Sequence, residues 1–304
     1  MNMRATIGEL AVLFILLALG YFGCKLKALT PDTGKVLTKL VFNITLPATI
    51  LNAVLGSGFG IGGGDTVIFM LFVLLAFLVY MAIALLSARI LIKEKKQRGL
   101  YAFMIAFGNI SFMGLPVAQA ILGAEAIIYV ALFNIPFWIA SFSIGVILVS
   151  GKKEKFDPKA LINPVLIVSA IAIPFSLLNF HLPAVITQSL SLAGRITTPA
   201  SMLIIGIILA QTPLKDVFTD IKLYPAALVK LVVVPLVVWL IFRTFVTDEL
   251  ILAVLVVLSA MPTAAKTAMF ALEYSNNEAT ASGGVFISTL LSGITIPIIV
   301  YFLL

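Results

Sequence analysis

An asparagine lies inside an apolar segment whose neighbouring residues disfavour a continuous helix. The stretch AFGNISFMGLP, residues 106–116, is the middle of an apolar segment long enough to cross a bilayer. Gly108 and Gly114 destabilise a helix, and Pro116 lacks a backbone donor. Non-helical backbone at membrane depth is tolerated only where protein or a water-filled cavity surrounds it. The stretch therefore predicts a helix that is broken near the membrane midplane, with the side chain of Asn109 at the break.

The break offers groups that suit a carboxylate. The Asn109 amide donates hydrogen bonds without the desolvation cost of a buried charge, and unwound backbone leaves N–H groups free. The N-terminus of a half-helix adds positive potential at the same place. We therefore place Asn109, Ser111, Gly114 and Pro116 in a candidate solute site. The alternative is a structural kink, in which the asparagine caps the broken helix or bonds to a neighbouring one.

A second proline-containing stretch, MPTAAK at residues 261–266, predicts another break inside a later apolar span. Pro262 and Thr263 would lie at this break, and Lys266 follows four residues after the proline. An ionisable residue at this depth is a candidate for function. The Lys266 ammonium could attract an anionic solute, stand in place of a bound cation, or compensate carbonyl groups at the end of a half-helix. We expect Asn109 and Lys266 to meet where the two broken helices cross.

Other polar residues inside apolar spans are weaker candidates. Asn43, Thr49 and Asn134 complete the candidate solute site, although Ser and Thr in membrane helices more often join neighbouring helices. Arg195 could line the solute path or bond to backbone carbonyls. Lys230 lies about two turns from the cytoplasmic end of its helix, which its long side chain could reach.

The acidic residues are informative by their positions. All 13 Asp and Glu residues lie at or near the ends of apolar spans. A cation–proton antiporter needs a carboxylate at the midplane, whereas the intramembrane charges here are positive and favour an anionic solute. The sequence contains no evident nucleophile–base pair, metal-ligand cluster or phosphate loop. It therefore predicts neither an enzyme nor a resident metal or cofactor.

The composition is that of a helical membrane protein. Of 304 residues, 62% are hydrophobic and 11% are charged, whereas soluble chains carry about 25% charged residues. The net charge of +7 comes mostly from Lys and Arg in short connections, which indicates membrane topology rather than nucleic-acid binding. We expect ten helical spans, at about 7–23, 35–55, 65–91, 99–122, 125–149, 160–179, 184–210, 222–243, 250–272 and 280–303.

The basic residues between the spans predict the orientation. Fifteen Lys and Arg residues lie in the odd-numbered connections, whereas Arg4 and Arg243 are the ones on the other side. The positive-inside rule places the odd connections in the cytoplasm, so both termini face outward from the cytoplasmic membrane.

The two halves of the chain resemble each other. NITLPATIL at 43–51 matches RITTPASML at 195–203 at an offset of 152 residues, and the same offset brings the fourth span near the ninth. We therefore expect two halves of five spans, about 1–150 and 156–304. Since five is odd, the halves insert with opposite orientation, as in the inverted repeats of many secondary transporters.

Four motifs together resemble the auxin efflux carrier family: GNISFMGLP at 108–116, NP at 163–164, MPTAAKTAMFALEY at 261–274 and STLLS at 288–292. The resemblance implies an all-α membrane fold related to bile-acid symporters and sodium–proton antiporters. It implies a scaffold of helices 1, 2, 6 and 7, and a mobile transport domain of helices 3–5 and 8–10 with broken, crossing helices 4 and 9. It also implies a homodimer built through the scaffold helices. Many relatives have Asn where Lys266 stands.

Residues and resemblance together predict a secondary carrier for a small organic anion, such as a carboxylate or auxin-like acid, that works by alternating access. One alternative is a sodium-coupled organic-anion symporter of the bile-acid type, for which a lysine near the crossing is unfavourable. A second alternative is a membrane sensor with the same fold that transports nothing.

A reporter fused after Leu304 tests the topology. Because both termini are expected outside, the reporter should be active only in its periplasmic form. Activity of a cytoplasmic reporter at the same position would contradict the arrangement of ten spans.

Overall fold

The computed structural model describes residues 3–56, 63–151, 164–177, 182–212, 217–218, 220–274 and 277–304. These ranges are almost entirely helical, and the β-type pairing found within them is one antiparallel bridge between Gly108 and Thr263. The predicted all-helical class is confirmed.

Several long helices are divided by π-helical turns, written η. The first half contains α1 (Met3–Lys25), α2 (Pro31–Leu40), η1 (Val41–Thr45), α3 (Leu46–Leu51), η2 (Asn52–Gly56), α4 (Gly63–Leu91), α5 (Lys95–Ala106), η3 (Ile110–Gly114), α6 (Leu115–Leu122), α7 (Ala126–Ala140), η4 (Ser141–Gly145) and α8 (Val146–Ser150). The second half contains α9 (Pro164–Leu177), α10 (Ala184–Gly194), α11 (Thr197–Gln211), α13 (Leu223–Leu228), η6 (Val229–Val233), α14 (Val234–Phe242), α15 (Glu249–Ser259), α16 (Lys266–Tyr274) and α17 (Glu278–Leu303).

Prolines explain three of the π-helical turns. Pro47, Pro116 and Pro235 each lie in the first turn of the α-helix that follows η1, η3 or η6. A proline lacks the N–H and its ring clashes with the carbonyl four residues earlier, so the turn before it must widen. The widened turn rotates the side chains on either side of it relative to one another, which matters below for Lys230.

Seven continuous helical stretches in the described ranges are long and apolar enough to cross a membrane, namely Ile7–Lys25, Pro31–Leu55, Gly64–Leu91, Ala126–Ser150, Ala184–Gln211, Leu223–Phe242 and Glu278–Leu303. The expected spans near 99–122 and 250–272 are interrupted, as the two proline-containing stretches predicted, and include the shorter apolar helices Ile110–Leu122 and Glu249–Ser259. The expected span at 160–179 is represented by α9, and its outer residues lie outside the described ranges. The chain is therefore an integral, multi-pass membrane protein.

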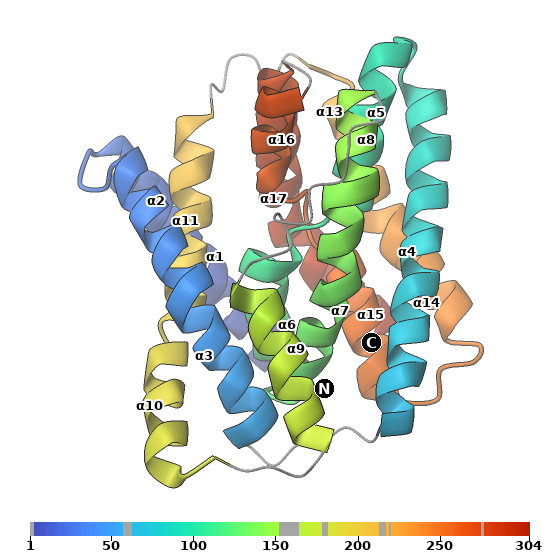
Figure 1. Ribbon diagram of the computed structural model, residues 1–304. Helices are drawn as coiled ribbons and strands as arrows, with labels where there is room; N and C mark the ends of the chain where they lie inside the picture. Colours follow the sequence, from blue (N-terminus) through green and yellow to red (C-terminus); the bar gives the residue numbers. More distant parts are fainter. Residues whose placement is uncertain are drawn as a thin grey trace.

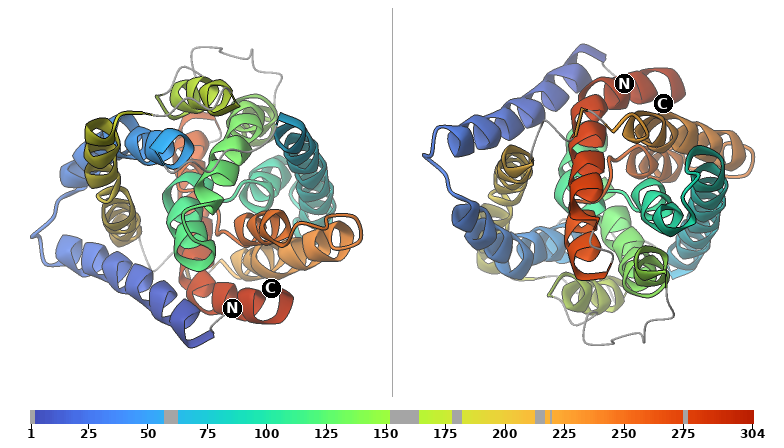
Figure 2. Two further views of the ribbon diagram at one scale, coloured as in Figure 1. Left: turned by 90° about the horizontal axis from the view of Figure 1, so that it is seen from below. Right: turned by 90° about the horizontal axis from the view of Figure 1, so that it is seen from above.

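Many helices, among them α4, α7 and α11, run roughly along one direction in Figure 1, whereas α1 and α17 cross it at a steep tilt (Figure 2). On one side, α1 packs against α11, and α3 packs against α9 and α10. On the opposite side, α4 packs against α5 and α14. The views along the helices place α6 and α7 between these groups (Figure 2). The half-helix α6, which follows the first interruption, thus lies in the middle of the molecule.

The contact between α1 and α11 depends on glycine. A Cβ atom at Gly20 would overlap the backbone carbonyl of Leu203, and one at Gly206 would overlap that of Leu17. Backbones this close allow van der Waals contact along both helices, which stabilises helix pairs where lipid is as apolar as the side chains.

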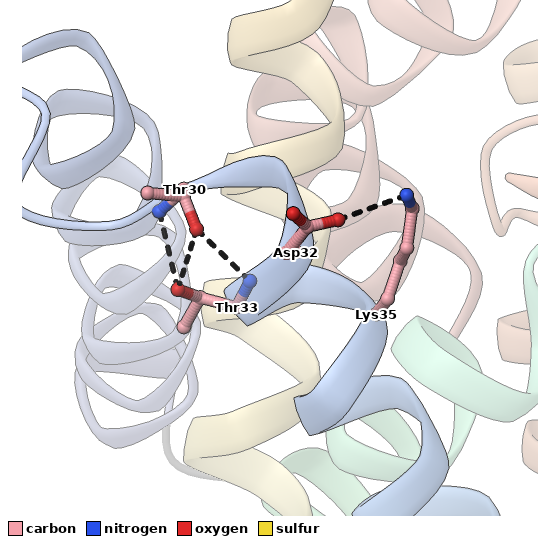
Figure 3. Close-up of polar contacts among 4 residues, drawn as sticks. All are labelled: Thr30, Asp32, Thr33 and Lys35. Atoms are coloured by element: carbon pink, nitrogen blue, oxygen red, sulfur yellow. Dashed lines mark hydrogen bonds and ion pairs between the residues drawn. The ribbon is translucent and has the colours of Figure 1, made fainter.

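The start of α2 is fixed by a capping box (Figure 3). The Thr30 hydroxyl accepts a hydrogen bond from the N–H of Thr33 at 3.2 Å, and the Thr33 hydroxyl accepts one from the N–H of Thr30 at 3.2 Å. Pro31 occupies the first helical position, where no donor is lost. The neighbouring ion pair between Lys35 and Asp32 is exposed and contributes little.

Substitution of Gly20 tests the close contact of α1 with α11. In Gly20→Ala the new methyl group meets the backbone of Leu203, so we expect a loss of about 1–3 kcal/mol from overpacking. Gly8→Ala in the same helix is the matched control, because nothing lies within 4 Å of a Cβ atom there. Thermal unfolding in detergent should show a lower midpoint for Gly20→Ala alone. Equal midpoints for the two variants would contradict the packing.

Candidate solute site

The two interrupted helices pair through their backbones. The N–H of Asn109 donates to the carbonyl of Pro262 at 2.7 Å, and the N–H of Ala264 donates to the carbonyl of Phe107 at 3.0 Å. We call this pairing of residues 107–109 with 262–264 the crossing. Broken helices leave backbone groups without partners inside the chain, and here each break supplies partners to the other. The breaks predicted around both prolines are present.

Side chains hold the crossing in place. The Thr263 hydroxyl donates to the carbonyl of Met104 in the last turn of α5 at 3.0 Å. The N–H of Thr263 donates to the hydroxyl of Ser288 on α17 at 3.1 Å. Gly108 is needed opposite, because a Cβ atom there would lie 3.2 Å from the carbonyl oxygen of Met261. Thr263 therefore joins α5, the second break and α17.

Asn109 lies at the crossing, and its side chain does not cap the helix that follows. The residue is 5% exposed and directly precedes η3, yet its amide makes no capping hydrogen bond. Its backbone carbonyl accepts from the N–H of Gly114 at 2.9 Å. The structural alternative, in which the amide caps the broken helix, therefore does not describe this side chain.

Ser111 and Asn134 form a separate buried pair. The Ser111 hydroxyl donates to the side-chain oxygen of Asn134 at 3.0 Å, and the Asn134 amide donates to the carbonyl of Val130 at 2.9 Å. Both side chains thus join η3 to α7. Gly114 lies on the other side of η3, where a Cβ atom would be 3.0 Å from the Leu258 side chain.

Lys266 has an aromatic environment. Its ammonium nitrogen is 4.2 Å from the ring centroid of Trp138, 4.8 Å from that of Phe137 and 5.6 Å from that of Phe142. The nitrogen is buried and has no hydrogen-bond partner among the described residues. The ammonium therefore makes no hydrogen bond to the Asn109 amide, and the aromatic faces on α7 and η4 stabilise it instead.

Lys230 also differs from expectation. The side chain is buried, and its ammonium donates to the carbonyl of Ser259, the last residue of α15, at 3.1 Å. The expectation that it reaches the cytoplasmic surface is wrong, because the residue lies on η6 and faces the protein interior. The compensation of half-helix carbonyls, considered above for Lys266, is thus performed by Lys230.

A cavity of about 530 Å³ lies against α6, the half-helix that follows the crossing, and residues 107–109 and 262–264 do not line it. It is bounded by α1, by α3 and η2, by α10 and α11, and by α6 with the start of α7. Its charged lining residues are Glu9 and Arg195, and its uncharged polar ones are Thr49, Asn52, Gln119, Ser191 and Thr198. Arg195 is exposed at the junction of α10 and α11. The cavity can therefore offer a guanidinium, amides and hydroxyls to a polar solute.

The predicted site residues separate into distinct places. Thr49 and Pro116 line the cavity. Asn109, Pro262 and Thr263 lie at the crossing, and Ser111, Asn134, Gly114 and Lys266 lie around it in the contacts given above. Asn43 is exposed on η1 and does not line the cavity. The Thr49 hydroxyl also lies 2.9 Å from that of Thr197, so it joins helices, as many membrane threonines do.

Several polar cavity residues were not predicted as site residues, and Gln119 and Glu9 illustrate why. Gln119 is a polar residue inside an apolar span, three positions after Pro116, and that spacing places both on one helix face. Glu9 lies near the beginning of the first span, where a carboxylate is expected to be merely solvated. The signal for Gln119 was present in the sequence, whereas that for Glu9 depends on the tertiary fold.

Comparisons with known proteins agree with this architecture. The profile of a family described as "Membrane transport protein" matches residues 5–160 and 153–300. A Rhizobium meliloti protein named "Putative malonate transporter" is 26% identical over 236 residues, covering 74% of this chain and 72% of the relative. A protein of Methanocaldococcus jannaschii named an uncharacterized transporter is 25% identical over 300 residues, covering 94% of this chain and 95% of the relative.

A third relative, from Methanothermobacter thermautotrophicus and also named an uncharacterized transporter, is 24% identical over 300 residues and covers 97% of both chains. These names point to transport rather than catalysis. The family profile covers nearly the whole chain, and it is the family that the four motifs indicated. The protein therefore belongs to the membrane transport protein family, the family of the auxin efflux carriers.

Proposed function

We propose that the protein is a secondary carrier that moves a small organic anion across the cytoplasmic membrane by alternating access. The observation that carries this proposal is the cavity, which brings the Arg195 guanidinium and the polar side chains of four helices next to an interrupted helix. Its volume of about 530 Å³ lies in the range of about 300–1,000 Å³ typical of small-molecule sites.

The lining of the cavity favours a carboxylate. Arg195 presents a fork of donors that matches a carboxylate, and Gln119 and Asn52 add amide donors. Glu9 reduces the net charge of the lining, so the solute should be held by directed hydrogen bonds rather than by net charge. The name of the Rhizobium meliloti relative makes malonate the first anion to test.

The packing supports a division into two units that move relative to each other. We propose a scaffold of α1, α2 with α3, α9, and α10 with α11, and a transport domain of the remaining helices. In support, α1 packs on α11 and α3 packs on α9 and α10. The cavity lies where this scaffold meets α6 and α7, and rocking of one unit against the other would alternate its access. The two units would combine helices from two inverted five-span halves, and the scaffold would form a homodimer.

In the orientation predicted from the basic residues, the cavity would be open toward the outside of the membrane. The cavity includes Glu9, near the N-terminus, and Ala124, in the connection between α6 and α7. Both positions face outward in that topology. The chain ends marked in Figure 2 lie close together, which supports placing both on one face of the membrane.

A sodium-coupled symporter is the closest alternative. Carbonyl groups at the end of a broken helix can coordinate sodium, but the Ser259 carbonyl already accepts a hydrogen bond from the Lys230 ammonium. We therefore expect transport that does not depend on sodium. A sensor that transports nothing would bind malonate without exchanging labelled for unlabelled solute.

Counterflow of labelled malonate in proteoliposomes tests the cavity as the solute path. Arg195→Gln should raise the KM for malonate about ten- to a hundredfold, because a charged hydrogen bond worth about 1.5–3 kcal/mol is lost. Arg195→Lys should retain part of the affinity, since the charge remains but the fork does not. Arg243→Gln, which removes an exposed guanidinium outside the cavity, is the matched control. An unchanged KM in Arg195→Gln would place the solute path elsewhere.

Asn109→Ala tests the crossing. We expect binding weakened by about 1–3 kcal/mol, or about ten- to a hundredfold in affinity, since a buried amide that makes no capping bond is removed. The unfolding midpoint without solute should remain near that of the parent, because the backbone pairing to Pro262 is kept. A variant that is as stable as the parent and transports malonate with the same KM would exclude the amide from the site.

A further inference from the structure

We propose that Lys230 is a positioning and selectivity residue of the carrier, whose buried ammonium fixes the end of α15 below the crossing and gives the crossing its preference for anions. The inference rests on the proposed transport function and adds a residue that neither the cavity nor the motif comparison includes.

The fold turns Lys230 inward. The residue is 1% exposed and lies on the π-helical turn η6, whose width follows from Pro235. Single π-turns inside α-helices occur frequently at functional sites, because they re-aim one side chain without ending the helix. Here the turn directs a lysine toward the protein interior, at a depth where ionisable residues are costly to bury.

The ammonium lies at the negative end of a helix. It donates to the carbonyl of Ser259, where α15 ends, and lies 5.6 Å from the ring centroid of the buried Tyr80. The carbonyl end of a helix carries partial negative charge, and an aromatic face attracts cations. Both contacts stabilise the ammonium, and the hydrogen bond to Ser259 in turn holds the point at which the chain leaves α15 for the crossing.

The ammonium also lies near the other side of the crossing. A Cβ atom at Gly108 would lie 3.2 Å from the Lys230 nitrogen, and Gly108 directly precedes Asn109. The Lys230 ammonium thus lies near the first break, at residues 107–109, and is hydrogen-bonded to the end of α15, which precedes the second break. A shift of either segment would disturb this contact, which is why we describe Lys230 as a positioning residue.

The charge of Lys230 has no carboxylate partner in the described part of the chain. The ion pairs found there are Lys35 with Asp32 and Lys222 with Glu94, and both are exposed. Charges interact more strongly in a protein interior than in water, so an uncompensated ammonium favours an anion at the neighbouring crossing. A bound carboxylate would supply the missing negative charge, and a neutral solute would not.

Two substitutions separate the charge from the hydrogen bond. Lys230→Gln removes the charge but keeps a donor for the Ser259 carbonyl, whereas Lys230→Arg keeps the charge in a larger group. Lys39→Gln, at an exposed position on α2, is the control for loss of one positive charge. Competition of malonate and of its monoamide, which has one negative charge fewer and nearly the same size, against labelled malonate in counterflow gives a ratio of affinities for each variant.

We expect the ratio of malonate to monoamide affinity to fall about tenfold in Lys230→Gln, and to stay near the parent value in Lys230→Arg and Lys39→Gln. A purely structural lysine would change both affinities alike and leave the ratio unchanged.

The outcomes distinguish the two proposals. A parent protein that exchanges no carboxylate overturns the transport function and the inference together. A parent that transports malonate, with an unchanged ratio in Lys230→Gln, overturns the selectivity role of Lys230 and leaves the transport function in place.

Discussion

The backbone pairing between residues 107–109 and 262–264 is the constraint on which the rest of the structure depends. Two helices end inside the protein, and each ending exposes carbonyl and N–H groups that water cannot satisfy at membrane depth. The bonds from Asn109 to Pro262 and from Ala264 to Phe107 satisfy them reciprocally. Each break is therefore stable only in the presence of the other, which couples the two halves of the chain at one point.

Three side-chain hydrogen bonds link the crossing and the segments next to it to other helices. Thr263 reaches back to Met104, Ser288 comes from α17, and Lys230 comes from η6. These partners hold the broken ends rigidly while leaving the Asn109 amide free of a capping role. Lys266 completes a different arrangement, in which the rings of Phe137 and Trp138 stabilise an ammonium that makes no hydrogen bond. The two buried lysines thus have separate environments and separate consequences.

The sequence predicted the features that depend on local chemistry. The breaks follow from glycine and proline near Asn109 and Pro262, and the helical class follows from composition and span length. It did not predict where the lysines point. Lys230 was expected to extend along its helix, but a π-turn before Pro235 rotates it inward. It also did not predict that the Lys266 ammonium would lie against aromatic residues about 130 positions earlier in the chain. Both outcomes depend on helix packing that spacing alone does not contain.

The cavity was beyond prediction for the same reason, since five separate helical segments line it. Its position nevertheless explains why the fourth helix is broken. Pro116 and Gln119 lie on α6, the half of that helix which follows the crossing, and they face the cavity. α6 also packs against α1 and α11, while the turn before it is anchored to α7 by Ser111 and Asn134. A solute bound against α6 therefore contacts one element that touches both proposed units. The break also lets α6 begin at its own proline and present Gln119 to the cavity, while the backbone groups freed by the break are paired at the crossing.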